Sequence, residues 1–272
     1  MKKIAIVIPN HKSHISEEEI ISLKSAKKHF IKYDKFFLIP GNLELDFDIS
    51  GFDIKKIDPT YFSTYLKYNE FLVNKKFYEI FLDYDYILIY QLDCLFFQAE
   101  SELEKFIFYD FIGPPHINIR KKRFTGTMNG GFSLRRIDSC IEALESKKFN
   151  LLNFKYVQIR HFLSIKRSIR LVSFLTKVFI QFLLKKIFKR EKVSFSKLFF
   201  QNFSKYFNED VFWSLFVNLF KKDFKLPGFK QASSFGFDKD PKIMFELNSQ
   251  KLPLGCHCWY KDGNRLFWDK YI

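Results

Sequence analysis

The sequence predicts an α/β fold with a mostly parallel sheet flanked by helices. A continuous apolar run, Tyr86–Phe97, is rich in Ile, Leu and Tyr, which is typical of a strand buried on both faces. Strand-like and helix-like segments also alternate through residues 1–148, as expected where helices connect parallel strands. The run contains Asp93, and a buried acid is costly unless it is paired or binds a metal.

Asp93 is therefore the first candidate functional residue. In open α/β sheets, ligands bind outside the carboxyl ends of the strands, which is where this acid is expected to lie. The alternative interpretation is an Asp that caps a turn or the following helix.

Local patterns predict the other elements of the first 148 residues. The apolar run Ile4–Ile8 ends at Pro9 and is too short for the hydrophobic region of a signal peptide, so it predicts the first strand. Ser16 and Glu19 form a capping box that starts a helix running to about His29. Further strands are predicted at Lys35–Ile39, Phe52–Ile57, Tyr86–Leu92, Phe111–Ile112 and within Met128–Leu134, and further helices at Tyr65–Leu82, Glu100–Phe108 and Asp138–Ser146.

Composition limits the classes of function. The 272 residues carry a formal charge of +15, which favours an anionic partner such as a nucleotide or a phospholipid surface. The four cysteines show no disulfide framework, and this fits a reducing compartment. Neither a G-x-G-x-x-G nor a G-x-x-x-x-G-K-[ST] motif is present, so the common dinucleotide and P-loop sites are not expected.

Most of the positive charge comes from the segment 149–206, in which Glu191 is the only acid. Its centre is amphipathic: an apolar helical face is predicted from Leu171, Val172, Leu175, Val178, Phe179, Phe182 and Leu183, and a polar one from Ser173, Lys177, Gln181 and Lys185. Lys177 interrupts the run, so a membrane-spanning helix is not expected. Two interpretations stay open: an interfacial helix on anionic lipid, or a bundle helix with a solvated basic face. Nucleic acid is not an expected partner, because the aromatic residues share the predicted buried face.

Two polar motifs follow this segment. Asn208-Glu209-Asp210 precedes the apolar pattern of a helix, and its two adjacent acids exceed what a helix cap requires. Gly255-Cys256-His257-Cys258-Trp259 lies near the end of the chain. Its Cys-x-Cys spacing has no second ligand pair, so a zinc site is not expected, and His257 gains interest only if it lies beside Asp93.

Together these stretches resemble the DUF5672 family of bacterial predicted sugar transferases and, more broadly, glycosyltransferases of the GT-A type. The stretches that carry the resemblance are VIPNHK, YNEFLVNKKFYEIFLDYDYILIYQLDCLFF, YDFIGPP, MNGGFSLRR, NEDVFW and LPLGCHCW. They cover most of residues 1–148 and 206–272. The resemblance implies a GT-A-like, Rossmann-like fold with the basic helical segment as an insertion.

The resemblance also implies a metal site, because GT-A enzymes hold Mn²⁺ or Mg²⁺ against the donor diphosphate through a D-x-D motif. Here that position reads Gln91-Leu92-Asp93-Cys94-Leu95, so Asp93 matches one Asp and the second is missing. Asp93 and His257 are the implied metal ligands, with Lys or Arg side chains as the alternative to a metal.

By motif position, the resemblance makes Asp210 the general base that takes the proton of the acceptor hydroxyl, with Glu209 binding acceptor or donor hydroxyls. Glycine permits close backbone contact, so the Asn-Gly-Gly stretch is expected to approach the donor sugar. The implied donor-binding residues are Pro9, Asn10, His11, Tyr68, Asn69, Gln91, Asp93, Asn129, Gly130 and Gly131.

The expected activity is therefore transfer of a sugar from a nucleotide-sugar, with UDP favoured, to a glycan or lipid-linked acceptor, with inversion. The product would belong to a bacterial surface polysaccharide or lipooligosaccharide, made by a cytoplasmic protein that is peripheral on the inner face of the membrane. The alternative is a non-catalytic, membrane-associated scaffold with a degenerate transferase fold. Residues 1–148 would bind the donor, 149–206 would contact the anionic membrane surface, and 207–272 would complete the active site.

Overall fold

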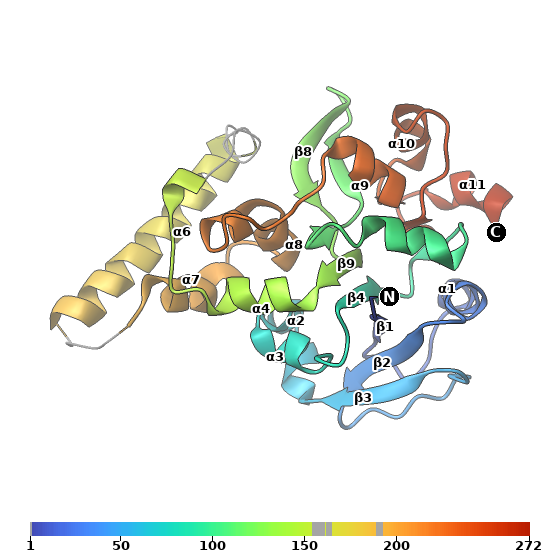
Figure 1. Ribbon diagram of the computed structural model, residues 1–272, viewed down its shortest axis with the longest axis horizontal. Coiled ribbons are helices and arrows are strands. Elements are labelled where there is room, and N and C mark those ends of the chain that lie inside the picture. The colour runs from blue at the N-terminus through green and yellow to red at the C-terminus, as the bar shows by residue number, and fades with distance from the viewer. Residues whose placement is uncertain (1, 154–160, 162–164, 189–192) are drawn as a thin grey trace.

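The protein is described by a computed structural model that covers residues 2–153, 161, 165–188 and 193–272 (Figure 1). Its centre is a six-stranded sheet in the order β3-β2-β1-β4-β9-β6. The first four strands in this order run parallel, and β9 is antiparallel to both of its neighbours. The strands are β1 (Ile4–Pro9), β2 (Asp34–Pro40), β3 (Asp53–Ile57), β4 (Tyr86–Tyr90), β6 (Phe111–Ile112) and β9 (Phe132–Arg136). The predicted α/β class with a mostly parallel sheet is confirmed.

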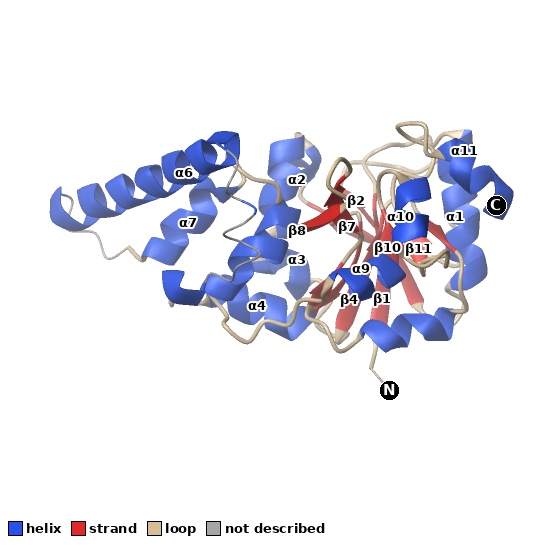
Figure 2. Cartoon of the chain, turned by 90° about the horizontal axis from the view of Figure 1, so that it is seen from above, coloured by secondary structure: helices blue, strands red, loops and turns tan. Residues whose placement is uncertain are grey.

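Both faces of this sheet are covered, which explains why its central strands read as continuous apolar runs. Every residue of β4 is buried. Alternate residues of β4 point to opposite faces: Ile87 and Ile89 belong to one apolar cluster, and Leu88 and Tyr90 to another. The helix α1 (Glu17–His29) packs on the second face and starts with the predicted capping box between Ser16 and Glu19. Figure 2 shows the strands between the helices.

Two predicted helices differ from the observed ones. The segment 65–82 forms two short helices, α2 (Tyr65–Leu72) and α3 (Lys75–Glu79), because the Asn74 side chain accepts a hydrogen bond from the Lys76 amide and starts a new helix. The segment Glu100–Phe106 is a 3₁₀ helix with no side-chain cap at its start. The helix predicted after β9 is present as α4 (Ile137–Glu145).

Two smaller sheets lie beside the carboxyl end of β4 and the amino end of β9, which are adjacent because these strands are antiparallel. One joins β5 (Leu95–Phe96), β10 (Gly236–Phe237) and β11 (Gly255–Cys256), and thereby ties the end of the chain to the segment after Asp93. The other is a hairpin of β7 (Pro115–Asn118) and β8 (Arg123–Met128). The remaining helices in this part are α9 (Phe229–Phe235), α10 (Pro241–Leu247) and α11 (Arg265–Trp268).

Among its described residues, the basic segment contains a 3₁₀ turn, Leu151–Asn153, and the longer helices α6 (Ile165–Leu183) and α7 (Phe195–Phe203). The helix α6 continues in a π-helical turn, Leu184–Phe188. The helices α6 and α7 lie at the end of the molecule away from α10 and α11 (Figure 1). Lys155, Arg160, Lys189, Arg190, Glu191 and Lys192 lie outside the described residues. Within the described part of the chain, no helix is both long enough and apolar enough to cross a bilayer.

The predicted apolar face of α6 needs correction. Phe174 and Val178 are fully buried, whereas Val172 and Phe179, which were assigned to the same face, are exposed. The reason is that α6 has apolar residues on two sides, and the spacing alone does not say which side packs on the core. The buried side contacts α7 and the helical run that begins with α8 (Glu209–Val211), so the insertion shares a core with the segment after it.

Candidate active site

A cleft of about 610 Å³ opens at the carboxyl ends of β1 and β4. The loop after β1 supplies one wall, the loop after β4 the floor, and Tyr260 and Lys261 a third side. A larger hollow of about 750 Å³, between α10 and α11, contains none of the predicted site residues. The predicted residues that line the first cleft are Pro9, Asn10, His11, Tyr68, Gln91 and Asp93.

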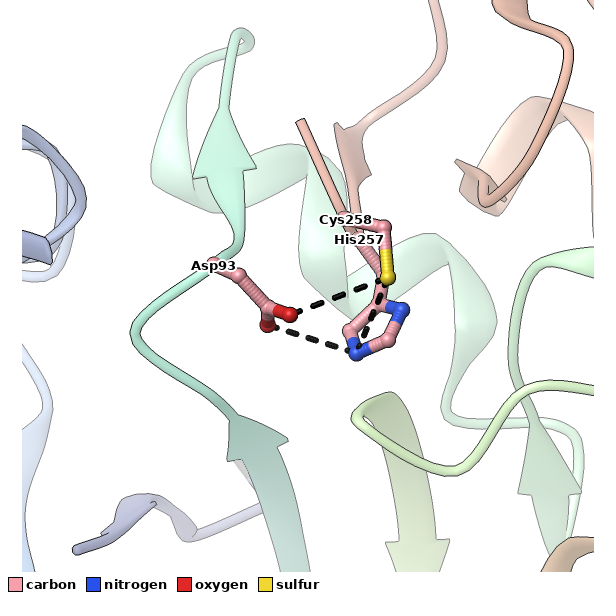
Figure 3. A group of neighbouring side chains, drawn as sticks. All are labelled: Asp93, His257 and Cys258. Carbon is pink, nitrogen blue, oxygen red and sulfur yellow. Dashed lines mark hydrogen bonds and ion pairs between the residues drawn. The ribbon is translucent and has the colours of Figure 1, made fainter. Parts of the chain in front are cut away.

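Asp93 is the centre of a cluster at this cleft (Figure 3). Its Oδ1 faces Nε2 of His257 at 3.3 Å, and its Oδ2 lies 3.7 Å from Sγ of Cys258. Lys261 donates to the same Oδ2 at 2.6 Å. The sequence predicted that Asp93 and His257 would lie together, but Cys258 and Lys261 were not among the predicted residues.

Asp238 holds the ring of His257 on the side away from Asp93. Its Nδ1 lies 2.8 Å from Oδ1 of Asp238, which leaves Nε2 directed at Asp93 and at Oε1 of Gln91, 3.1 Å away. Burial lowers the pKa of His257, but the negative charges of Asp93 and Asp238 outweigh burial and raise the pKa well above its usual value. A carboxylate on the far nitrogen is the arrangement that orients a metal-binding histidine in proteins.

The residues at Asp93 fit a divalent cation. Ligand atoms from Asp93, His257 and Cys258 all lie within 4.8 Å of one another. Oδ1 of Asp93 is buried and accepts no hydrogen bond, although a buried carboxylate oxygen normally has a partner. Cys258 adopts a left-handed backbone with φ of 55°, which is uncommon for a residue with a side chain and is a feature of functional sites. Of the two expected ions, this oxygen, nitrogen and sulfur set fits Mn²⁺ better than Mg²⁺, which prefers oxygen alone.

A second histidine extends the cluster toward Asp210. Nε2 of His116 lies 3.2 Å from Oδ2 of Asp238, so Asp238 bridges His116 and His257. Burial raises the pKa of Asp210, and the nearby charge of His116 partly opposes that rise. Asp210 is half-buried, does not line the cleft itself, and has one oxygen bonded to the Val211 amide at 2.7 Å. Asp210 therefore lies near enough to His116 and Asp238 for their charges to act on its pKa, and the sequence indicated neither of these two residues. The role of Asp210 as a base stays a prediction.

The model of one protein family matches residues 51–257, three quarters of the chain, and its description is "Protein of unknown function (DUF5672)". The chain belongs to this family. No curated protein matches this chain. Among solved structures it is similar to the apo-form glycosyltransferase GlyE of Streptococcus pneumoniae TIGR4, with 13% sequence identity and a TM-score of 0.43. That alignment covers 99% of this chain, which spans 60% of the length of GlyE in the solved structure.

In this DUF5672 protein, Glu209 does not contact the cleft. Its carboxylate meets the fully buried guanidinium of Arg135 through two contacts, 2.9 and 3.0 Å long. Asn69 accepts a hydrogen bond from the Glu209 amide at 2.8 Å, and its own amide donates to the carbonyl of Tyr65. Both side chains are buried and bonded within the protein, and the expected substrate contacts of Glu209 and Asn69 stay predictions.

The Asn-Gly-Gly stretch also acts within the protein. A Cβ atom on Gly131 would overlap Nε2 of His257 and Oε1 of Gln91, and a Cβ atom on Gly130 would overlap Oε1 of Glu209. Asn129 accepts a hydrogen bond from the Gly131 amide at 2.7 Å, and none of the three residues lines the cleft. The absence of a Cβ atom at Gly130 and Gly131 thus permits close contact with protein side chains, and the expected contact of this stretch with the donor sugar stays a prediction.

Proposed function

We propose that this protein is a glycosyltransferase that moves a sugar from a nucleoside-diphosphate sugar, most plausibly UDP-linked, to the hydroxyl of a glycan or lipid-linked acceptor. The observation that carries the proposal is the buried Asp93 carboxylate, with an unbonded oxygen beside His257 and Cys258, at the strand edge of an open cleft. The expected pathway is synthesis of a surface polysaccharide or lipooligosaccharide at the cytoplasmic face of the membrane.

The cleft suits a nucleotide in shape and in chemistry. His11, Phe62 and Tyr68 form a stacked row along one wall, with centroid distances of 6.2 and 5.6 Å between successive rings. A planar base can stack on such a row. Lys12 and Lys261 also line the cleft and carry the positive charge that a diphosphate requires.

The Asp93 cluster would bind the diphosphate end of the donor. Asp93, His257 and Cys258 are the residues that would hold a divalent cation, most plausibly Mn²⁺. Such an ion, when bound, neutralises the negative charge that develops on a leaving diphosphate. Lys261 provides a cation at the same carboxylate. It would either turn toward the phosphate oxygens when metal binds or replace the metal.

Asp210 would act as the base in a single displacement. The acceptor oxygen attacks the anomeric carbon, and the bond between that carbon and the diphosphate oxygen breaks. The acceptor proton passes to the Asp210 carboxylate, and the products are the inverted glycoside and the nucleoside diphosphate. Its raised pKa suits this role, because a base is most effective when its pKa lies near the working pH.

The proposal is tested by a screen for release of the nucleotide (UDP, GDP or CMP) from UDP-, GDP- and CMP-sugars, with Mn²⁺ and with EDTA. We expect release from one donor class with Mn²⁺. Asp210→Asn should abolish turnover, while Asp83→Asn, a change at an exposed acid, should not affect it. Full activity in Asp210→Asn would exclude the assigned base, and full activity in EDTA would exclude the metal. If calorimetry detects no binding of any donor, the non-catalytic scaffold is the better description.

A further inference from the structure

The helix α6 has two apolar sides, and the fold uses only one of them. Phe174 and Val178 are fully buried. The Phe174 ring packs on Phe199, Phe203 and Phe207, at centroid distances between 4.8 and 5.8 Å. These contacts are sufficient to attach α6 to the body of the protein.

The other side of α6 is apolar and exposed over the whole described helix. Val172 is 62% exposed, Phe179 54% and Ile187 60%. Residues at spacings of three, four and seven lie on one side of an α-helix, so Ile169, Val172, Phe179 and Ile180 form one stripe, with the exposed Thr176 between Val172 and Phe179. Within α6 this stripe is about 17 Å long at 1.5 Å per residue. Leu184 and Ile187 are also exposed and lie in the π-helical turn that continues α6.

Basic residues border this stripe. Lys166, Arg170 and Lys177 are exposed and follow one edge of the helix, and Lys186 is exposed on the other edge. Residues 149–190 contain no Asp or Glu. An apolar stripe between cationic edges, without acids, is the pattern of a helix that lies in the headgroup region of a membrane with its long cationic side chains directed at lipid phosphates.

The position of α6 permits this contact. It lies at one end of the molecule in both views, and α7 is packed beside it on the side of the protein body (Figures 1 and 2). A second copy of this chain is a poor occupant, because it would bring the same cations face to face. We propose that the outer face of α6 docks on the surface of an anionic phospholipid bilayer. This surface is independent of the cleft, so the proposal stands or falls separately from the proposed transferase activity.

The test is sedimentation of the purified full-length protein with vesicles of phosphatidylcholine alone or of phosphatidylcholine with phosphatidylglycerol. We expect binding to the anionic vesicles, weakened by salt, and roughly tenfold or more weaker binding to the neutral ones. The double variant Val172→Ser/Phe179→Ser should lose roughly tenfold or more in anionic vesicle binding. The matched control is Ile31→Ser/Phe108→Ser, which changes an exposed aliphatic and an exposed aromatic residue elsewhere.

A charge variant separates the electrostatic contribution to vesicle binding from the apolar one. Lys166→Gln/Arg170→Gln should weaken binding to anionic vesicles and leave the low affinity for neutral vesicles unchanged. Circular dichroism and the melting temperature should match the wild type in all three variants, since every changed side chain is exposed. Absence of binding to anionic vesicles, or equal binding by wild type and Val172→Ser/Phe179→Ser, would overturn the proposal. So would a wild-type dimer in solution that the double variant disrupts, because the stripe would then be an interface between copies.

Discussion

Glu209 and Asp93 are both buried carboxylates that lie beside cations, and they differ in how exposed those cations are. Each carboxylate has one buried oxygen that accepts no hydrogen bond. Glu209 faces Arg135, which is fully buried and meets it through two short contacts. Asp93 lines the cleft and faces Lys261, whose side chain is half exposed. A closed pair of the first kind holds the fold together. An open one of the second kind keeps a charge available for a ligand.

The largest expected effect tests the closed pair. Arg135→Ala should lower the free energy of unfolding by about 3–5 kcal/mol, because it leaves the Glu209 carboxylate buried without its cation. Denaturant titration measures this change. The matched control is Arg136→Ala, at a partly exposed residue that pairs with Asp138, and it should cost no more than about 1 kcal/mol. Equal losses in the two variants would mean that the Arg135 pair does not stabilise the fold.

The open pair should respond in activity and not in stability. Asp93→Asn should reduce donor turnover by about 100- to 1,000-fold, as expected when a group that stabilises transition-state charge is lost. Its melting temperature should stay near that of the wild type in metal-free buffer. In addition, Mn²⁺ should raise the melting temperature of the wild type and not that of the variant, because a ligand stabilises the state that binds it. A large loss of stability in Asp93→Asn would mean that Asp93, like Glu209, stabilises the fold.

The ionised Asp210 carboxylate should support turnover and at the same time lower the stability of the folded protein at neutral pH. Its raised pKa means that folding favours the protonated form, so its stabilising contribution is present at low pH and is lost as the pH rises through that pKa. Turnover needs the ionised form and should therefore rise with pH over the same range, above the ordinary Asp value of about 3.9. Asp210→Asn should remove turnover and melt at a higher temperature than the wild type at neutral pH. A pH-independent rate would contradict the assigned role.

The smallest effect concerns Lys261. Because its side chain is half exposed, Lys261→Ala should change the free energy of unfolding by no more than about 1 kcal/mol. If Lys261 and a metal compete for Oδ2 of Asp93, the variant should bind Mn²⁺ more tightly than the wild type, which calorimetry would measure. If Lys261 instead takes the place of the metal, the variant should lose activity in EDTA as well as in Mn²⁺.

Local sequence rules were sufficient for most of the fold. The apolar run before Asp93, the capping box at Ser16 and the Pro9 that ends the first strand each act within a few residues, and each predicted element is present. The spacing of apolar residues predicted one helix across Asn74, but the side chain of Asn74 caps a new helix there. The same spacing did not identify the buried side of α6, because this helix has apolar residues on two sides.

The site was predictable only in part, for a different reason. Asp93 and His257 were paired beforehand only as the metal ligands that the family resemblance implies. Asp238 and Cys258 reach them through the two-residue strands β10 and β11, and His116 through the β7–β8 hairpin. The strand β11 pairs with β5, where Cys256 lies opposite Leu95, 161 residues earlier in the sequence. No local pattern predicts such pairing. A histidine and an acid near the ends of short apolar stretches are the only signals that the sequence offers for them.

The close contact between Gly131 and the His257 ring restricts which residues family members can carry at these two positions. Because a Cβ atom at position 131 would occupy the space of the His257 ring and of the Gln91 amide, a side chain at position 131 and an imidazole at position 257 exclude each other. The two positions are 126 residues apart and must change together. A family member that replaces Gly131 with a larger residue should therefore also lack the histidine, and this covariation would mark the members that have given up the Asp93 cluster.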